Sequence, residues 1–457
     1  MTIDSHKVEK LIQQMLPNTP VGIYLEDAKT GKVIYERRSN ETFQPGSNTK
    51  LFSAAASLFI LGPKFQYETS LLVNPDTFKS GVVNGDLYVK FSGDPSLTTL
   101  DLQNLVKDLK NAGVKQITGN IVLDNTLFKD PVYGPGWGWC NLNWYYAAPI
   151  TAIMLNENKI KVVLTPNKTL GEKGSVALAE DEITQFQIKS DIISVTETDA
   201  EKNCRLDVDI NENNDISMTG CWPAKDKADT LKVAIKNPTH LAEQILLESF
   251  KTENISFSGK ITVGKSPENL KQLAVHRSVP LADLLKPILL DSNNLYAESI
   301  TKMMGVIKFH EGTFQAGTRA IKEVLNKEFG IPSNQLSLED GSGLSRFNLV
   351  TPAQLARLLF VMFHNKEFSE LFINALPSAG ATGTLKNRMQ TFDVKDQIRA
   401  KTGTLNGVST LSGYITKNNK PELIFSIMIN NALESAEDVQ FENELCKLFL
   451  LELNDNH

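Results

Sequence analysis

The stretch Pro45-Gly46-Ser47-Asn48-Thr49-Lys50 leads into an almost wholly apolar run, Leu51 to Leu61. Pro-Gly is a turn signal, and a helix that is apolar on nearly every side is typical of a buried position. The sequence therefore predicts a buried helix with Ser47 in its first turn. Lys50 follows three residues later, which puts it on the same helical face and within hydrogen-bonding reach of Ser47.

This pair of residues has a chemical use at the start of a helix. A lysine whose pKa is lowered by burial, by a second cation or by the helix N-terminus can take the proton of a serine hydroxyl. The free N–H groups of the first helical turn can stabilise an oxyanion. Alone, the pair is weak evidence, because an N-cap Ser47 and a solvated Lys50 are the more ordinary explanation of it.

The composition excludes several classes of protein. A chain of 457 residues predicts two or three domains. A net charge of −6 gives no electrostatic support to nucleic-acid binding. No apolar run approaches the ~18 residues of a membrane-spanning helix. The N-terminus lacks the basic-then-apolar pattern of a signal peptide, which fits either a cytosolic protein or a mature chain with an added methionine.

Cysteine and histidine positions argue against a metal site and against a Ser-His-Asp mechanism. The 4 cysteines include no C-x-x-C pair, so neither a zinc site nor a thioredoxin-like site is predicted. Cys204 and Cys221 bracket a polar, turn-rich stretch; they either form a local disulfide or are two unrelated small residues. None of the 6 histidines stands in a catalytic context, which favours a lysine as the base.

The order of the predicted elements places both ends of the chain in one domain. The relevant elements are strands at 21–25, 32–36, 409–415 and 422–429 and a helix at 436–453. We expect these strands to form one antiparallel sheet with the last helix on its face, in an α+β fold. Residues of about 66–270 are then an insertion into this domain.

The insertion itself is predicted to be two domains. Residues 66–165 and 230–269 form the first, and the polar, β-patterned segment 166–229 forms a second domain inserted in it. The aromatic loop 135–146 is either a wall that faces a ligand or a local mini-core beneath a loop. From about 270 the chain is predicted to be helical.

Two further short motifs follow the Ser47 pair along the chain. Ser292-x-Asn294 falls in the loop between two predicted helices, and Lys401-Thr402-Gly403 at the end of an edge strand. The ordered set of three motifs occurs in penicillin-binding proteins and class A β-lactamases. Each motif is weak by itself, but the set is specific, because each member falls on the structure that its task requires.

The chain resembles the class C low-molecular-mass penicillin-binding proteins, the D-alanyl-D-alanine carboxypeptidase/endopeptidases of the penicillin-binding protein 4 type, over nearly its whole length. Its long gap between the first two motifs, with two inserted domains, is typical of them. The other stretches that carry the resemblance are Ser92-Gly93-Asp94-Pro95, Pro135-Gly136-Trp137, Asp340-Gly341-Ser342-Gly343-Leu344-Ser345, Gly383-Thr384-Leu385-Lys386-Asn387-Arg388-Met389 and Arg399-Ala400-Lys401-Thr402-Gly403-Thr404. The resemblance implies a serine DD-peptidase/β-lactamase-like catalytic domain made of residues 1–65 and 270–457.

The resemblance also implies a role for each motif residue. Ser47 attacks the carbonyl of the penultimate D-alanine, and Lys50 takes its proton. Ser292, in contact with both lysines, relays the proton to the leaving amine, and Asn294 holds the substrate amide. Lys401 supplies positive field and helps to keep Lys50 neutral.

Substrate binding is implied for two other groups of residues. The Thr402-Gly403-Thr404 segment binds the terminal carboxylate with its hydroxyls, and the N–H groups of Ser47 and Thr404 form the oxyanion hole. The aromatic loop, which includes Trp139, is the other group. In this loop relatives carry an acidic residue that binds the amino group of diaminopimelate. The matching residue here is Asn141, which brings no charge.

The implied partners are peptidoglycan stem peptides, cleaved at terminal D-Ala-D-Ala or at D-Ala-diaminopimelate cross-links, and β-lactams as covalent inhibitors. The resemblance implies no metal or organic cofactor, and a periplasmic mature chain from which the signal peptide has been removed. It leaves open the balance of carboxypeptidase and endopeptidase activity, a homodimer and loose membrane association.

Two alternatives remain at this point. A β-lactamase would need fast deacylation, and the Glu-x-x-x-Asn element of class A enzymes is missing from the expected place. A non-catalytic peptidoglycan-binding protein would not require a nucleophile, two lysines and Asn294 in register.

Overall fold

The computed structural model describes residues 3–182, 186–391, 394–433 and 435–455. The chain divides into two compact units. The first unit contains Met1–Phe65, Gly134–Trp137 and Val279–His457, and the second contains Gln66–Tyr133 and Gly138–Ser278. A further division of the second unit into two domains, as the sequence predicts, stays a prediction.

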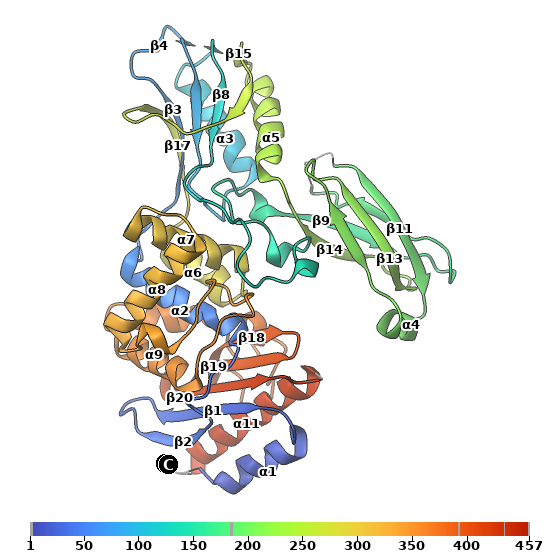
Figure 1. The fold of residues 1–457 in the computed structure, drawn as a ribbon, viewed down its shortest axis with the longest axis vertical. Coiled ribbons are helices and arrows are strands. Elements are labelled where there is room, and N and C mark those ends of the chain that lie inside the picture. The colour runs from blue at the N-terminus through green and yellow to red at the C-terminus, as the bar shows by residue number, and fades with distance from the viewer. Residues whose placement is uncertain (1–2, 183–185, 392–393, 434, 456–457) are drawn as a thin grey trace. The chain divides into compact units, whose positions relative to one another are not determined.

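An antiparallel sheet organises the first unit. Its strand order is β18-β19-β20-β1-β2, so β18 is an edge strand (Figure 1). The strands are β1 Val21–Asp27, β2 Val33–Arg37, β18 Ile398–Leu405, β19 Val408–Lys417 and β20 Lys420–Asn430. Val21 of β1 pairs with Ile429 of β20. The predicted sharing of one sheet by the two ends of the chain is therefore confirmed.

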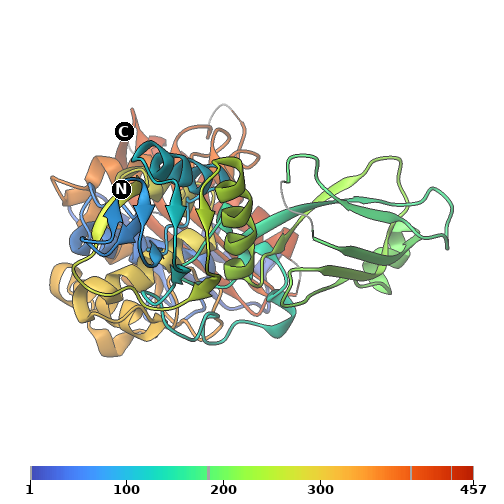
Figure 2. The same cartoon turned by 90° about the horizontal axis from the view of Figure 1, so that it is seen from above.

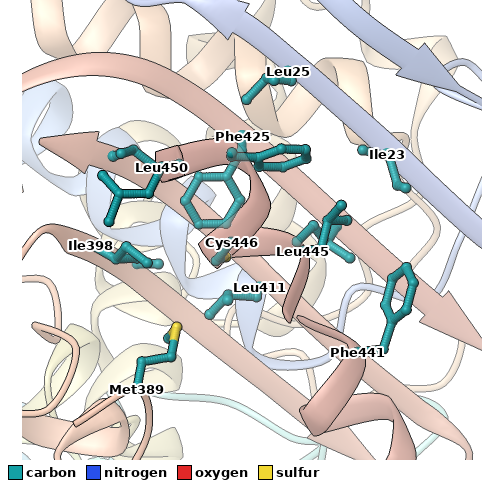
Figure 3. Packing of buried hydrophobic residues seen from close by; sticks show 14 of the residues in the cluster. Ile23, Leu25, Met389, Ile398, Leu411, Phe425, Phe441, Leu445, Cys446 and Leu450 are labelled. Atoms are coloured by element: carbon teal, nitrogen blue, oxygen red, sulfur yellow. The ribbon is translucent and has the colours of Figure 1, made fainter. Parts of the chain in front are cut away.

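One face of this sheet is covered by the first and last helices, α1 (Ser5–Met15) and α11 (Ser435–Asp455). Figure 3 shows side chains of the strands packed against those of α11. The labelled members are Ile23, Leu25, Met389, Ile398, Leu411, Phe425, Phe441, Leu445, Cys446 and Leu450. Because β1 comes from the start of the sequence and β18, β19, β20 and α11 come from its end, this core fixes both ends of the chain to the same unit.

The other helices of the first unit gather around α2 (Thr49–Ile60). They are α6 Leu281–Leu289, α7 Asn294–Phe309, α8 Phe314–Phe329, α9 Pro352–His364 and α10 Ser369–Asn374. α2 contacts α6, α7, α8 and α9, and α9 also packs on β1, β19 and β20. All residues of α2 from Thr49 to Leu58 are buried, so the burial predicted from its apolar sequence is confirmed.

The described residues of the second unit form sheets of three to five strands. Their strand orders are β16-β8-β6-β3-β17, β15-β7-β5-β4, β10-β9-β14 and β11-β13-β12. The strands are β3 Glu68–Val73, β4 Phe78–Lys79, β5 Val82–Val83, β6 Leu87–Lys90, β7 Gln116–Ile117, β8 Ile121–Asp124, β9 Lys159–Thr165, β10 Ser175–Leu178, β11 Ile188–Val195, β12 Asp207–Ile210, β13 Ile216–Pro223, β14 Asp229–Ala234, β15 Ser256–Phe257, β16 Ile261–Val263 and β17 Lys271–Arg277.

The helices of the second unit are α3 Thr99–Asn111, α4 Glu197–Lys202 and α5 Pro238–Thr252. α3 and α5 pack against each other. Figure 2 shows the strands of residues 159–234 gathered away from this helix pair. In the same segment Cys204, between α4 and β12, and Cys221, in β13, form a disulfide with a Cα–Cα distance of 5.8 Å. Of the two alternatives, the local disulfide is therefore the one observed.

One expectation about local structure was wrong. Helical structure was expected from about residue 270, but 271–277 form strand β17, which pairs antiparallel with β3. The register places Val275 beside Ser70. β17 is thus the edge strand of a sheet in the second unit, and α6 follows it in the chain.

No helix in the described parts of the chain combines the length and the apolar character that a membrane crossing requires.

Candidate active site

Ser47 lies in a 3-10 turn, η1 (Gly46–Asn48), which directly precedes α2. The sequence predicted that Ser47 lies in the first turn of the α-helix, whereas it lies in the 3-10 turn just before the α-helix begins at Thr49. Gly46 has a φ of +52°, and a Cβ built on it would lie 3.3 Å from the backbone nitrogen of Thr404. Asn48 Nδ2 donates to the carbonyl of Lys401 at 3.2 Å. The turn that carries Ser47 is thus fixed against the edge strand β18.

The amine of Lys50 is completely buried and has three polar neighbours. Its Nζ lies 2.9 Å from Ser47 Oγ, 2.6 Å from Asn294 Oδ1 and 2.8 Å from the carbonyl oxygen of Ser342. Asn294 is the first residue of α7, whose N-cap is Asn293. The first two sequence motifs therefore meet at Lys50, with Asn294 on the helix rather than in the preceding loop.

Counting donors shows how the proton of Ser47 is shared. A neutral lysine amine has two N–H donors and one lone pair. The Asn294 side-chain oxygen and the Ser342 carbonyl can only accept, so they use both donors. The lone pair is left for the third neighbour, which is the hydroxyl of Ser47. With a neutral amine Ser47 therefore donates to Lys50, whereas a protonated Lys50 donates to Ser47 Oγ.

The electrostatics of Lys50 favour the neutral amine. Burial lowers the pKa of Lys50 from 10.5 to about 7, against the opposing effect of the negative groups Glu298 and Asp340. Burial, with Lys50 as a second cause, also lowers the pKa of Lys401 well below its ordinary value. Desolvation is therefore the main reason that an amine can act as a base near neutral pH here.

The second lysine contacts the second motif. Lys401 Nζ donates to Ser292 Oγ at 2.9 Å and to the carbonyl of Thr402 at 2.9 Å. Ser292 has a left-handed backbone, with φ +58°, in the turn between α6 and α7. The sequence expectation was that Ser292 touches both lysines. Among the described residues its hydrogen bond is with Lys401 only.

The third motif lies on β18, at the edge of the sheet. Lys401 and Gly403 are buried, Thr402 is half-buried and Thr404 is exposed. The hydroxyls of Thr402 and Thr384 lie 2.7 Å apart. The backbone nitrogen of Thr404 lies beside the turn of Ser47, at the position of Gly46.

The glycine-rich loop at 340–345 was part of the family resemblance, but no role was predicted for it. Its Ser342 carbonyl is one of the three neighbours of Lys50. Asp340 supports this loop by accepting from the N–H groups of Gly343 and Ser345, at 2.9 and 2.6 Å. Trp137 Nε1 also donates to Asp340, at 2.9 Å. A contact made through a backbone carbonyl has no side-chain signature, so no sequence signal pointed to it.

Trp139 and Asn141 belong to the second unit. Trp139 is 86% exposed. Asn141 Oδ1 accepts a hydrogen bond from the hydroxyl of Tyr146 at 3.2 Å. Their part in substrate binding stays a prediction. The described residues include no group of three or more His, Cys, Asp or Glu side chains arranged to hold a metal ion.

Comparison with known proteins gives a consistent result. The model of the D-Ala-D-Ala carboxypeptidase 3 (S13) family matches residues 5–449. The chain is 32% identical to the D-alanyl-D-alanine carboxypeptidase DacB of Haemophilus influenzae over 457 residues, covering 97% of this chain and 94% of that relative. It is 31% identical to a D-alanyl-D-alanine carboxypeptidase of Actinomadura sp. (strain R39), covering 90% and 77%.

Solved structures agree with these relatives. The structure of penicillin binding protein 4 (dacB) from Haemophilus influenzae superposes with a TM-score of 0.86 at 32% identity, covering 96% of this chain and 98% of that one. A structure of the same protein complexed with a novel β-lactam superposes with a TM-score of 0.81 at 30% identity, with the same coverage. The α+β fold with a penicillin-binding type of catalytic unit, expected from the sequence, is thereby confirmed.

Proposed function

The chain belongs to the D-Ala-D-Ala carboxypeptidase 3 (S13) family of serine DD-peptidases, and from this we propose that Ser47 is its nucleophile and Lys50 its general base. The observation that carries the proposal is the 2.9 Å contact between Ser47 Oγ and the buried amine of Lys50. Both other neighbours of that amine are acceptors, so the free lone pair points to the serine.

The first half-reaction is acyl transfer to Ser47. Its hydroxyl proton passes to Lys50 while Oγ adds to the carbonyl of the penultimate D-alanine. The backbone N–H groups of Ser47 and Thr404 stabilise the oxyanion, a contribution that is typically worth about 10²–10³-fold in rate per donor. Collapse of the intermediate breaks the C–N bond, and the leaving D-alanine amine takes up a proton. We assign its delivery to Ser292, which Lys401 holds at 2.9 Å. Ser292 takes up in exchange the proton that Lys50 received, so Lys50 is neutral again before hydrolysis.

The second half-reaction is hydrolysis. Water adds to the acyl-enzyme, the C–O bond to Ser47 breaks, and the serine regains its proton. A β-lactam would acylate Ser47 in the same way, but its opened ring stays attached and blocks water. We therefore expect β-lactams to act as covalent inhibitors, in line with the β-lactam complex of the Haemophilus influenzae relative.

The substrate follows from the family and from the threonine side chains. Thr402 and Thr404 offer hydroxyls to a terminal carboxylate, which favours the D-Ala-D-Ala end of a peptidoglycan stem peptide. Asn141 brings no charge to the aromatic loop, so we expect weak preference for a free diaminopimelate ammonium. A chain acting on this polymer would work in the periplasm.

Intact-mass spectrometry after incubation with benzylpenicillin tests this function, on the wild type and on Ser47→Ala. We expect a mass gain of one penicillin that is absent from the variant. An unmodified protein with intact penicillin would remove the acyl-enzyme mechanism and favour a non-catalytic binding protein. Penicillin consumed without an adduct would indicate a β-lactamase. Release of D-alanine from stem peptides whose diaminopimelate amino group is either free or acetylated then measures the preference expected from Asn141.

A further inference from the structure

One fully buried carboxyl group beside the site has no part in the mechanism above. Glu298 lies on α7, four residues after Asn294, so both side chains project from the same face of the helix. The two oxygens of Glu298 accept the backbone N–H groups of Gly341 and Ser342, at 2.9 and 2.8 Å. Burying a carboxyl group costs free energy unless such partners are supplied. The burial of Glu298 therefore calls for a structural or functional explanation.

The backbone held by Glu298 is the backbone that meets the general base. The N–H of Ser342 binds Glu298, and the C=O of the same residue accepts from Lys50 at 2.8 Å. Close approach of this loop to α7 requires glycine at 341, because a Cβ there would lie 1.8 Å from Thr301 Oγ1. The loop is thus pressed onto the helix at the point where its carbonyl reaches the lysine.

We propose that Glu298 is a positioning residue for Lys50, holding the carbonyl of Ser342 on the amine so that the lone pair stays directed at Ser47. With Asn294 one turn earlier, a single face of α7 then sets both contacts of Lys50 other than the nucleophile. The inference rests on the proposed function, since it assigns a role within the same acylation step.

The charged surroundings of Glu298 define what its removal changes. Asp340 faces it from the loop, and burial together with Asp340 raises the pKa of Glu298 above its ordinary value. Lys50 faces it from α2, and Lys302 follows one turn later on α7, also buried. In the described residues α6 and α8 bury no charged side chain. The charge of Glu298 raises the pKa of Lys50, so losing it lowers that pKa.

The test measures acylation by benzylpenicillin in stopped flow, on the wild type, Glu298→Gln and Glu298→Ala. Saturation curves separate the acylation rate constant from the dissociation constant of the first complex, and pH 5 to 10 covers the titration of the base. Glutamine keeps the shape but can accept with one atom only, so one of the two N–H groups loses its partner.

We expect the acylation rate constant of both variants to fall by about 100-fold, the usual cost of misplacing a catalytic group by ~1 Å. The dissociation constant should change less than the rate constant, and the acid limb of the pH profile should move to lower pH. A merely structural role would reduce the amount of folded enzyme without moving that limb.

Ser53→Ala is the matched control, because Ser53 Oγ donates to the carbonyl of Gly341 at 2.7 Å and thus supports the same loop without holding Ser342. It should lose thermal stability as the Glu298 variants do, yet keep the acylation rate constant within about threefold. Wild-type rate constants and an unmoved acid limb in folded Glu298 variants would overturn the inference. Failure of the proposed function looks different, since the wild type itself would then form no adduct.

Discussion

At the scale of single residues, the base that we propose depends on burial, which lowers the pKa of a lysine. An exposed lysine holds its proton up to its ordinary pKa of 10.5, whereas the pKa of Lys50 falls to about 7 when its amine leaves water. Three neighbours within 2.9 Å then divide its two donors and its lone pair without leaving any unused. The nucleophile, the base and the loop carbonyl form one hydrogen-bonded group.

The first prediction concerns the pH dependence of acylation. Since only the neutral amine can accept the proton of Ser47, the acylation rate by benzylpenicillin should fall about tenfold per pH unit below 7 and level off above it. Stopped-flow acylation between pH 5 and 10, with the folded fraction followed by circular dichroism, measures this. A rate that still rises above pH 9 would show an unshifted Lys50 and contradict the electrostatic argument.

At the scale of elements, the site depends on how closely the turn η1 approaches the edge strand β18. Gly403 lies at the point of contact and is buried. A Cβ built on it would lie 2.2 Å from Thr410 Oγ1 and 2.7 Å from the carbonyl of Pro45. Any other residue at this position must therefore push the strand away from the turn.

The second prediction follows for Gly403→Ala. Overpacking of this kind costs about 1–3 kcal/mol of unfolding free energy. Moving β18 also moves the N–H of Thr404, an oxyanion donor in our proposal, so acylation by benzylpenicillin should slow by about 10²-fold. Thermal unfolding and acylation kinetics of the same preparation measure both effects.

Arg399→Ala, on the same strand, is the control for this variant. Its side chain makes no hydrogen bond to any described residue, so wild-type acylation is expected. Equal acylation by the Gly403→Ala variant and the wild type would mean that the spacing between η1 and β18 is unimportant for the reaction.

Many of the helices, strands and turns could be predicted from the sequence, for reasons specific to each segment. The helix after Ser47 was predictable because its apolar residues leave no polar face for solvent. The turn between β19 and β20 was predictable because Asn418 and Asn419 tolerate left-handed backbone, and both adopt it, with φ of +53° and +61°. The first two motifs gave Ser47 and Asn294, which are two of the three hydrogen-bonding neighbours of Lys50.

Other features were beyond the reach of sequence patterns. Strand β17 was missed because its short sequence, KQLAVHR, has no clean alternation, and its pairing with β3 is set by tertiary contacts. Ser342 was missed because it acts through a carbonyl, which every residue has. Glu298 was missed because a glutamate inside a helix is ordinary until its complete burial is known.

At the scale of the whole molecule, the proposed catalytic residues and the inserted segment 138–278 belong to different compact units. Every hydrogen bond described above for Ser47, Lys50 and Lys401 is made within the first unit, which both ends of the chain build together. The disulfide Cys204–Cys221 belongs to the second unit. This separation predicts that the stability of one unit can be changed without changing the chemistry of the other.

The third prediction tests that separation with the double variant Cys204→Ser and Cys221→Ser. The disulfide spans a sequence separation of 17 residues, and a loop of this size stabilises by about 3 kcal/mol. The variant should therefore unfold its second unit at a lower temperature, seen as faster hydrogen exchange in strands β11 to β13. Acylation by benzylpenicillin at 25 °C should keep the wild-type rate, because no residue of the Lys50 group has been changed.

The matched variant is Cys446→Ala, in the core of the first unit, where the cysteine is completely buried. Loss of its sulfur should cost about 1–2 kcal/mol and lower the temperature at which acylation is lost, while hydrogen exchange in the second unit stays unchanged. The two variants thus have opposite expected patterns. If loss of the disulfide instead slowed acylation, or lowered the temperature at which acylation is lost, the two units would be energetically coupled. The inserted segment would then stabilise the catalytic unit itself.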